Sequence, residues 1–412
     1  MKPTTRNASP PDAPSIPRTR DRDERAGRNA APADGRQLSI VVARNEADLR
    51  PWVAQWERLA AEAVEPNVFY EPWMLLPALR HLCAGCTLRT LLILASDPLA
   101  PSREPELCGV IPLQHRKLRG LGTTICRLWK YSHCFLCTPL LRADVAGQCL
   151  DALLDWLRSD REGGAVMQFD EVSGDGPFHQ ALVDRLFDRQ SLRFVTDCHT
   201  RALLRCDTDA EAYLRNAISG EGRRAHARRL RRLGEAGNVS IAPVEPDGDV
   251  LEWVAQFLEL EAAGWKGKLG TALACTDADR AFLNEVVAGA FSRGRLLALA
   301  IRLDGRFLAQ RIGFTAGAGS FSFKTAFAEE FARYSPGALM EIENIRRVHD
   351  FPQIRWMDSC TRPDNALINR LWTHRRTIQS VAVATGRPPG GLAVSAMPLL
   401  RWLNRVARRP GV

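Results

Sequence analysis

The stretch FKTAFAEEFARYSPGALMEIE, residues 323–343, decides how the second half of this chain folds. An aromatic run with the alternation of a β-strand ends near Phe327, a short polar loop follows, and Ser335 and Pro336 then open an apolar helix. Serine is a favoured N-cap and proline a favoured first helical residue, so this pair predicts where the helix starts. The free N–H groups of that helix end also predict an anion site suited to a pyrophosphate. A plain helix start explains the same residues about as well.

The elements around this stretch repeat an order that is already present in the first half of the chain. Each half predicts three strands, then a helix, then a fourth strand, with few identical residues between the halves. In chain order, the expected elements are 88–95, 107–114, 125–136, 145–157 and 165–172 in the first half, and 295–303, 307–315, 320–327, 338–349 and 354–359 in the second. The sequence therefore predicts an α/β (α+β) fold of two similar units, each a mixed sheet flanked by helices.

Composition and chain-breaking Pro and Gly residues divide the sequence into four parts. Residues 1–37 are expected to be a disordered tail, because they contain almost no large apolar side chain. A first unit follows at 38–200, and a second at 201–384 that begins with an arginine-rich helical linker. Residues 385–412 form a Pro/Gly break and then a basic amphipathic helix.

The overall composition excludes several classes of protein. The 412 residues are 45% hydrophobic and 25% charged, which is ordinary for a globular protein and excludes wholesale disorder, collagen and coiled coil. The net charge of +9 lies mainly in the tail (+3) and in residues 385–412 (+5), which leaves about +1 for the middle and no signal for nucleic-acid binding there. No signal peptide and no run of 18 apolar residues is evident, so we expect a cytoplasmic protein.

Familiar catalytic and metal motifs are absent. The sequence has no Walker loop, no H-E-x-x-H helix, no G-x-S-x-G elbow and no Rossmann fingerprint. Eleven cysteines without a secretion signal argue against a disulfide framework. The pairs Cys83/Cys86 and Cys134/Cys137 have zinc-like spacing, but their apolar neighbours favour packed thiols, so we predict no metal.

Two basic segments leave their role open. Arg223 to Arg232 contains six arginines in ten residues, which suits phosphate groups, lipid headgroups or a solvated linker helix. The C-terminal helix interleaves large apolar residues with arginines. It is expected either to lie on an anionic membrane surface or to dock on its own domain.

Several segments together resemble a known family. They are Asn67-Val-Phe-Tyr-Glu-Pro-Trp-Met-Leu-Leu-Pro, Gly264-Trp-Lys-Gly, Phe323-Lys-Thr, Phe331-Ala-Arg-Tyr-Ser-Pro-Gly, Trp356-Met-Asp-Ser and Leu371-Trp-x-x-Arg-Arg. In this order they resemble the CelD-like (cellulose biosynthesis protein-like) branch of the GNAT acyltransferase superfamily, which is related to the Fem-type aminoacyl transferases. The resemblance spans about residues 38–384. It implies a tandem GNAT fold and transfer of an acyl group from acyl-CoA, such as acetyl-CoA, to an amine or a hydroxyl.

One feature departs from that superfamily. Its pyrophosphate signature is Gln/Arg-x-x-Gly-x-Gly/Ala, whereas Gly337 comes one position late after Arg333. The first half has a near match, Lys117-Leu-Arg-Gly-Leu-Gly, but a strand is expected after it. We favour the second unit as the catalytic one, because its loop leads directly into a helix.

Candidate site residues follow from the needs of acyl transfer, which are a base, an acid for the leaving thiolate and donors for the phosphates. The predicted catalytic residues are Asp358 as first choice of base, Glu341 as second choice, and Tyr334 as the acid. The predicted cofactor-binding residues are Ser335, Gly337, Ala338 and Lys324, and the predicted substrate-binding residues are Trp265 and Lys266. Each also has a plain structural explanation, such as a turn cap, a helix-end charge or packing.

The sequence thus predicts an acyltransferase with a small-molecule or glycan-type acceptor, and we expect a role in polysaccharide or envelope biosynthesis. The alternative is a degenerate GNAT-like interaction module in the assembly of exopolysaccharide or envelope. A nucleic-acid-binding module is the third choice, because no aromatic stacking platform accompanies the basic stretch.

Overall fold

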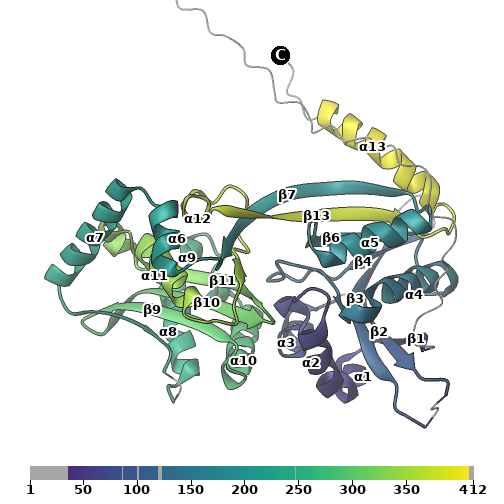
Figure 1. The fold of residues 1–412 in the computed structure, drawn as a ribbon, viewed down its shortest axis with the longest axis horizontal. Helices are drawn as coiled ribbons and strands as arrows, with labels where there is room; N and C mark the ends of the chain where they lie inside the picture. The colour runs from purple at the N-terminus through teal and green to yellow at the C-terminus, as the bar shows by residue number, and fades with distance from the viewer. Residues whose placement is uncertain (1–35, 86, 100–101, 119–122, 246, 408–412) are drawn as a thin grey trace, which may run out of the picture.

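The computed structural model describes residues 36–407, except 86, 100–101, 119–122 and 246. Two groups of helices and strands stand side by side, and two long strands, β7 (Arg193–Arg205) and β13 (His374–Ala384), run between them (Figure 1). Nearly all of the predicted tail, the end of the motif Lys117–Gly122, and Arg408 and Arg409 lie outside the described residues. None of the described helices is long and apolar enough to cross a bilayer.

The first unit contains six strands before β7. Its elements are β1 (Gln37–Ala43), α1 (Glu46–Leu49), η1 (Arg50–Trp52), α2 (Val53–Glu62), η2 (Val68–Tyr70), α3 (Pro72–Leu82), β2 (Leu88–Ser96), β3 (Glu106–Leu118), β4 (Thr123–Leu128), β5 (Leu140–Leu141), η3 (Ala143–Val145), α4 (Ala146–Ser159), β6 (Val166–Ser173) and α5 (Pro177–Asp188).

The second unit follows β7. Its elements are α6 (Ala210–Ala217), α7 (Gly220–Glu235), β8 (Val239–Pro243), α8 (Val250–Ala263), α9 (Trp265–Lys268), η4 (Leu273–Cys275), α10 (Asp277–Ser292), β9 (Leu296–Leu303), β10 (Arg306–Ala316), β11 (Gly319–Phe327), η5 (Glu329–Tyr334), α11 (Pro336–His349), β12 (Trp356–Asp358) and α12 (Ala366–Leu371). After β13, the chain ends in α13 (Gly390–Ala407).

One sheet runs through both units, and the sequence of antiparallel and parallel strand pairs is the same from its two ends. Its strand order is β1-β2-β3-β4-β6-β13-β7-β12-β11-β10-β9-β8, with β5 paired to β3. From β2 to β6 the pairs are antiparallel, antiparallel and parallel, and from β9 to β12 they follow the same sequence. The predicted repeat and the predicted mixed α/β class are therefore confirmed.

The two units exchange their last strands at the middle of this sheet. Strand β13, the last strand of the chain, pairs with β6 of the first unit, whereas β7 pairs with β12 of the second unit. The two long strands also pair with each other, from His374 opposite Leu203 to Val383 opposite Arg193. The domain boundary predicted at residue 200 falls within β7, so each unit's sheet contains a strand from the other half of the chain.

Several predicted elements differ in extent from the observed ones. The helical segment that begins at Glu46 is interrupted by a 3-10 turn at Pro51, and the arginine-rich helical linker consists of two helices that break at Ser219, whose hydroxyl caps α7 through the N–H of Gly222. The strand expected over 125–136 ends at Leu128. The residues after it are apolar because they form a buried loop, a pattern that resembles a strand when only hydrophobicity is considered.

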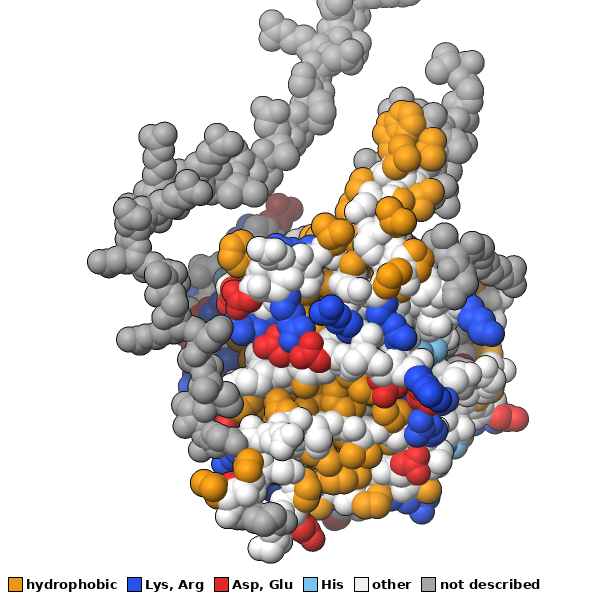
Figure 2. Space-filling view, turned by 90° about the vertical axis from the view of Figure 1, so that its right-hand side faces the viewer, with side chains coloured by type: hydrophobic (Ala, Val, Ile, Leu, Met, Phe, Trp, Pro, Cys, Tyr) orange, Lys and Arg blue, Asp and Glu red, His pale blue; other side chains and the backbone are white. Residues whose placement is uncertain are grey.

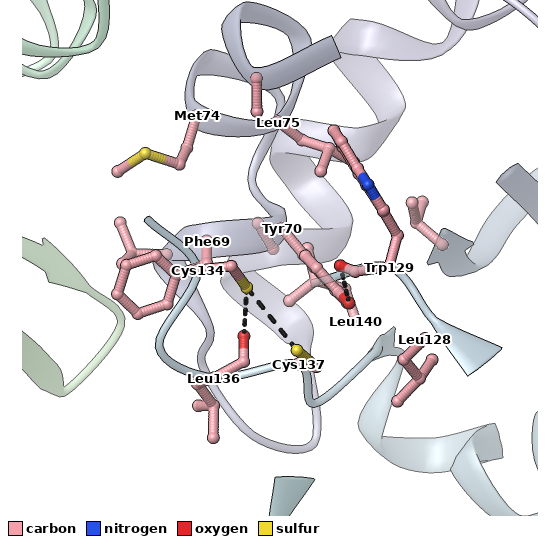
Figure 3. Close-up of a cluster of buried hydrophobic side chains, with 14 of the residues drawn as sticks. Phe69, Tyr70, Met74, Leu75, Leu128, Trp129, Cys134, Leu136, Cys137 and Leu140 are labelled. Carbon is pink, nitrogen blue, oxygen red and sulfur yellow. Dashed lines mark hydrogen bonds between the residues drawn. The ribbon is translucent and has the colours of Figure 1, made fainter. Parts of the chain in front are cut away.

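That loop packs at the centre of the first unit (Figure 3). Cys134 and Cys137 are buried, with 3.7 Å between their sulfur atoms, and the hydroxyl of Tyr70 donates to the carbonyl of Trp129. Phe69, from the same cluster, contacts Phe321 of β11 edge-on, with 5.7 Å between the ring centroids. Through this contact the apolar core is continuous between the units.

The described residues contain no group of three or more potential metal ligands, while Cys86 lies outside them.

Candidate functional site

The start of α11 is built much as the sequence predicts. Ser335 is the N-cap residue and Pro336 the first helical residue, but Ser335 adopts a left-handed conformation (φ 53°) and its side chain makes no capping hydrogen bond. The carbonyl of Ser335 instead accepts from the N–H groups of Ala338 (2.9 Å) and Leu339 (3.1 Å). Among the described hydrogen bonds none uses the N–H of Gly337, so that group points out of the helix end with the positive end of the helix dipole behind it.

Tyr334 precedes this helix start and is largely buried. Its ring stacks on Phe331, with 6.3 Å between centroids, and the guanidinium of Arg333 lies 4.8 Å from the ring centre. It belongs to an apolar cluster with Leu339 and Met340 of α11, which packs on β9 and β10. The predicted acid therefore lies next to the predicted phosphate site.

Asp358, the predicted base, is fully buried at the end of β12. Nε and Nη2 of Arg201 each lie 2.7 Å from one of its carboxylate oxygens, and Nη1 of Arg376 lies 2.9 Å from Oδ2. The backbone N–H of Cys360 donates to Oδ1 at 3.0 Å. Burial alone would raise the pKa of Asp358, but the two arginines outweigh it and hold the pKa below its ordinary value. Two guanidinium groups and a backbone N–H surround this carboxylate, which favours a structural role over the predicted one.

Arg201 and Arg376 come from the two exchanged strands, β7 and β13. Arg376 also pairs with the buried carboxylate of Glu65, and Arg201 donates to the carbonyl of Phe135 at 2.6 Å. The Asp358 carboxylate therefore joins both exchanged strands to the second unit, and through Glu65 to the first.

Glu341, the second choice of base, is also buried within a complete set of donors. It accepts from Nη1 of Arg311 (2.7 Å), from the amide of Asn344 (3.0 Å) and from the indole N–H of Trp372 (2.8 Å). These contacts tie α11 to β10 and to the end of α12. An acceptor molecule could reach neither carboxylate without breaking these bonds.

Lys324 is different, because it is half-buried and faces titratable side chains from both units. It lies beside a bulge in β11, where the register against β10 shifts at Phe323. Its Nζ lies 3.2 Å from Nδ1 of His133, a residue of the first unit, and Nε2 of His133 lies 2.8 Å from the carboxylate of Asp279 in α10. These three side chains form what we call the cross-unit relay.

Charges and burial set the protonation of this relay. Burial, helped by the charge of Lys266 and opposed by Glu261 and Asp279, lowers the pKa of Lys324 to about 8. Burial and the charge of Lys324 also lower the pKa of His133, although Asp279 acts in the opposite direction. A neutral His133 can accept from Lys324 at Nδ1 while donating to Asp279 at Nε2.

Lys266, a predicted substrate-binding residue, lies beside this relay. Its Nζ contacts Glu261 at 2.7 Å and the carbonyl of Thr325, the residue after Lys324, at 3.2 Å. The neighbouring Trp265 is about half exposed (51%), and its backbone N–H donates to the carboxylate of Glu329 at 2.6 Å. An exposed indole next to a half-buried ammonium offers an apolar and a polar contact to an acceptor.

The strands open where Lys324 lies. Strands β11 and β12 pair only from Gly319 opposite Trp356 to Phe321 opposite Asp358, and β11 then continues to Phe327 without β12 as a neighbour. Lys324 of the relay therefore lies on the part of β11 that has no β12 neighbour.

The structure therefore brings some predicted residues together and separates others. Lys324 and Lys266 are neighbours, and Tyr334, Ser335, Gly337 and Ala338 share one helix start. Asp358 and Glu341 lie in separate buried networks. The sequence analysis missed His133, Asp279, Glu261, Arg201 and Arg376 as members of these sites. Of these residues only His133 lies beside a motif that the sequence analysis discussed, the pair Cys134/Cys137 with its zinc-like spacing.

Comparisons with known proteins agree with this architecture. Residues 220–365 match the family model described as acetyltransferase (GNAT) domain. The chain carries a GNAT acyltransferase domain. The matched range contains every predicted site residue and Asp279, but not His133. No curated protein sequence matches the chain.

Solved structures are similar in fold. The structure described as FemX aligns with a TM-score of 0.53 at 12% identity, covering 79% of this chain and 95% of that one. A conserved protein of unknown function from Bacteroides thetaiotaomicron aligns with a TM-score of 0.49 at 9% identity, covering 80% of this chain and 97% of that one. A tandem GNAT protein from the clavulanic acid biosynthesis pathway aligns with a TM-score of 0.39 at 15% identity, covering 85% of this chain and 99% of that one. At these identities the FemX likeness concerns the fold alone. The family match supports an acyltransferase enzyme, and the narrower CelD-like assignment stays a prediction.

Proposed function

We propose that this protein transfers an acyl group from an acyl-CoA thioester to an amine or a hydroxyl, and that the second unit carries the chemistry. The observation that supports this most is the position of the GNAT match, which covers the start of α11, the diverging end of β11 and Lys324. The acceptor we propose is a small molecule or a glycan, in polysaccharide or envelope biosynthesis.

In this proposal the donor's phosphates bind at the start of α11. The N–H of Gly337 and the partial positive charge of the helix end favour an anion there, with Ser335 and Ala338 shaping the mouth. The pantetheine arm then follows the unpaired part of β11 and brings the thioester toward Lys324. Trp265 and Lys266 contact the acceptor from the other side.

We assign the proton transfer to Lys324 rather than to Asp358 or Glu341, because both carboxylates are enclosed by donors. Neutral Lys324 takes the proton of the acceptor amine or hydroxyl as the acceptor's lone pair attacks the thioester carbonyl carbon. The carbon–sulfur bond breaks, and the departing thiolate takes a proton for which Tyr334 is the proposed source. His133 and Asp279 hold the Lys324 ammonium in place and accept no proton themselves.

The first experiment measures donor binding and turnover together. Acetyl-CoA, longer acyl-CoAs and free CoA are each added while the melting temperature is recorded, because a ligand specific for the native state must raise it. Release of CoA thiol is then followed with amine and sugar acceptors. Stabilisation by an acyl-CoA and acceptor-dependent thiol release are the expected results. If no acyl-CoA raises the melting temperature, the interaction-module alternative replaces this proposal.

Variants then test the assignment. Lys324→Met should abolish thiol release and leave donor stabilisation in place, and Tyr334→Phe should slow release without the same loss. Lys268→Met is the matched control, since Lys268 is exposed and pairs only with Glu329 among the described residues. Full thiol release by Lys324→Met would return the role of base to another group.

A further inference from the structure

The last helix of the chain leaves the body of the protein part-way along its length. Near its start, Val394 is buried against Val166, Ala382 and Ala384, at the outer surface of β6 and β13. Met397 packs there as well, and Nη1 of Arg401 donates to the backbone carbonyl of Val195 in β7 at 3.3 Å. Toward its C-terminal end α13 rises away from the body (Figure 1). The sequence left open whether this helix docks on the protein or binds elsewhere. In the structure its first part docks on β6 and β13, and its C-terminal part extends away from them.

The outward side of α13 is apolar. Five of its large side chains are about half exposed or more: Leu392 (78%), Leu399 (58%), Leu400 (54%), Trp402 (59%) and Leu403 (47%). Leu392, Leu399 and Leu403 are spaced by seven and four residues, so they line one side of the helix. Apolar side chains are visible along the helix where it rises from the body (Figure 2). Single exposed leucines are common, but a row of them marks an interaction site.

The apolar surface continues at the base of the helix. Leu192 and Leu392 both line a hollow of about 520 Å³ between α13 and the ends of α4 and α5. The same hollow is lined by three arginines, Arg158, Arg189 and Arg387. Arg189 is neutralised by Asp151 and Asp155. Arg387 donates to two backbone carbonyls and pairs with no carboxylate among the residues that the structure describes. Apolar and cationic groups thus lie together beside the helix.

The positive charge of the C-terminal residues indicates which kind of partner this surface binds. The sequence after Asp364 contains no acidic residue, and residues 401–412 carry four arginines, at 401, 405, 408 and 409. A second copy docking through α13 would place these arginines near their own equivalents, which costs free energy. An anionic bilayer instead offers phosphates to the arginines and an apolar layer to the leucines and Trp402.

We propose that α13 binds the surface of an anionic lipid bilayer. The helix lies in the interface, with Leu399, Trp402 and Leu403 below the headgroups and the arginines at the phosphates. The helix packs on β6, β7 and β13, whereas the relay belongs to β11, α10 and the loop after β4, so the inference stands independently of the proposed acyl transfer.

Vesicle co-sedimentation of the full-length protein tests this inference. The protein should bind vesicles in which about a third of the lipid is anionic phosphatidylglycerol, and bind neutral phosphatidylcholine at least about tenfold more weakly. Raising the salt to about 1 M should weaken the anionic binding, because the Debye length then falls to about 3 Å. Equal binding to both vesicles would overturn the role of charge.

Two double variants separate specific from general effects. Leu399→Glu with Leu403→Glu should reduce anionic-vesicle binding by at least about tenfold, since it places charges where apolar burial is needed. Leu251→Glu with Leu269→Glu is the matched control, because both leucines are exposed but lie in the second unit, and it should bind normally. If the Leu399/Leu403 variant binds normally, or if it instead abolishes a dimer seen by light scattering, the membrane proposal is wrong.

Discussion

Lys324 of the second unit lies 3.2 Å from the imidazole of His133 in the first unit, so the relay exists only where the two units meet. Asp279 completes it from α10 at 2.8 Å. The edge-on contact of Phe69 with Phe321 and that of Trp73 with Phe314 (5.4 Å) hold the same interface. A site of this kind cannot be built from one unit, which gives a physical reason for the tandem arrangement.

The first prediction concerns the pH dependence of thiol release. A base must be deprotonated, and the pKa of Lys324 is lowered to about 8, so kcat/KM should rise by ~10-fold per pH unit below about 8 and level off above it. Measuring kcat/KM between about pH 6 and 10 checks this, since that range spans the transition. A flat profile would show that the group acting as base does not titrate in this range.

The second prediction uses a neighbouring charge that adds to the effect of burial on this pKa. The charge of Lys266 lowers the pKa of Lys324, whereas Glu261 raises it, so Lys266→Met should move the rising limb of the profile to higher pH. A merely structural defect would lower kcat/KM at every pH without moving the limb. Lys268→Met serves as the control and should leave the limb where it is in the unaltered protein.

The third prediction concerns Asp358. Removing one partner of a buried ionic network leaves the others unpaired, so Asp358→Asn should lower the free energy of unfolding by about 3–5 kcal/mol. Because the pKa of Asp358 is lowered in the folded protein, its contribution is present above its unfolded pKa of about 4 and fades as the pH falls further. Urea unfolding at neutral and acidic pH measures both effects.

A surface pair supplies the control for this experiment. Asp207 pairs with Arg205 on the surface, so Asp207→Asn should cost less than about 1 kcal/mol. An Asp358→Asn protein that keeps its full stability but loses thiol release would instead support the role of base that the sequence suggested.

Much of the architecture was predictable because it depends on local patterns. The repeat of strands and helices is encoded in hydrophobic periodicity, and the start of α11 in Ser335 and Pro336. The strand exchange was not predictable, since nothing in the sequence of β13 states which unit it joins. Asp358 and Glu341 were natural candidates for bases, but the arginine partners of Asp358 lie 157 and 18 positions away and that of Glu341 lies 30 positions away. His133 and Asp279 are 146 positions apart, and only the fold makes them neighbours.

The fourth prediction compares two glycines. A Cβ on Gly337 would lie 3.9 Å from its nearest neighbour in Leu367, so Gly337→Ala should leave stability unchanged or raise it by up to about 1 kcal/mol. A Cβ on Gly319 would lie 2.3 Å from the ring of Trp356, so Gly319→Ala should be clearly destabilising. Thermal unfolding distinguishes the two.

The same position tests the phosphate site. Gly337→Trp fills the mouth of α11 and should raise the KM for the acyl-CoA at least about tenfold with little change in kcat, because it removes binding common to ground state and transition state. An unchanged KM would mean that the donor's phosphates bind elsewhere.

The last prediction concerns the strand exchange itself. If the chain is cut between β7 and α6, the fragment 36–205 keeps β6 and β7 but loses β13, the strand that lies between them in the sheet. The fragment 206–412 loses β7, which separates β12 from β13, and also loses Arg201, which leaves the buried Asp358 with one arginine. Neither fragment should show a cooperative unfolding transition alone, and co-expression should restore a complex that unfolds as one unit. A fragment 36–205 that unfolds cooperatively by itself would show that the first unit is stable without the exchanged strand.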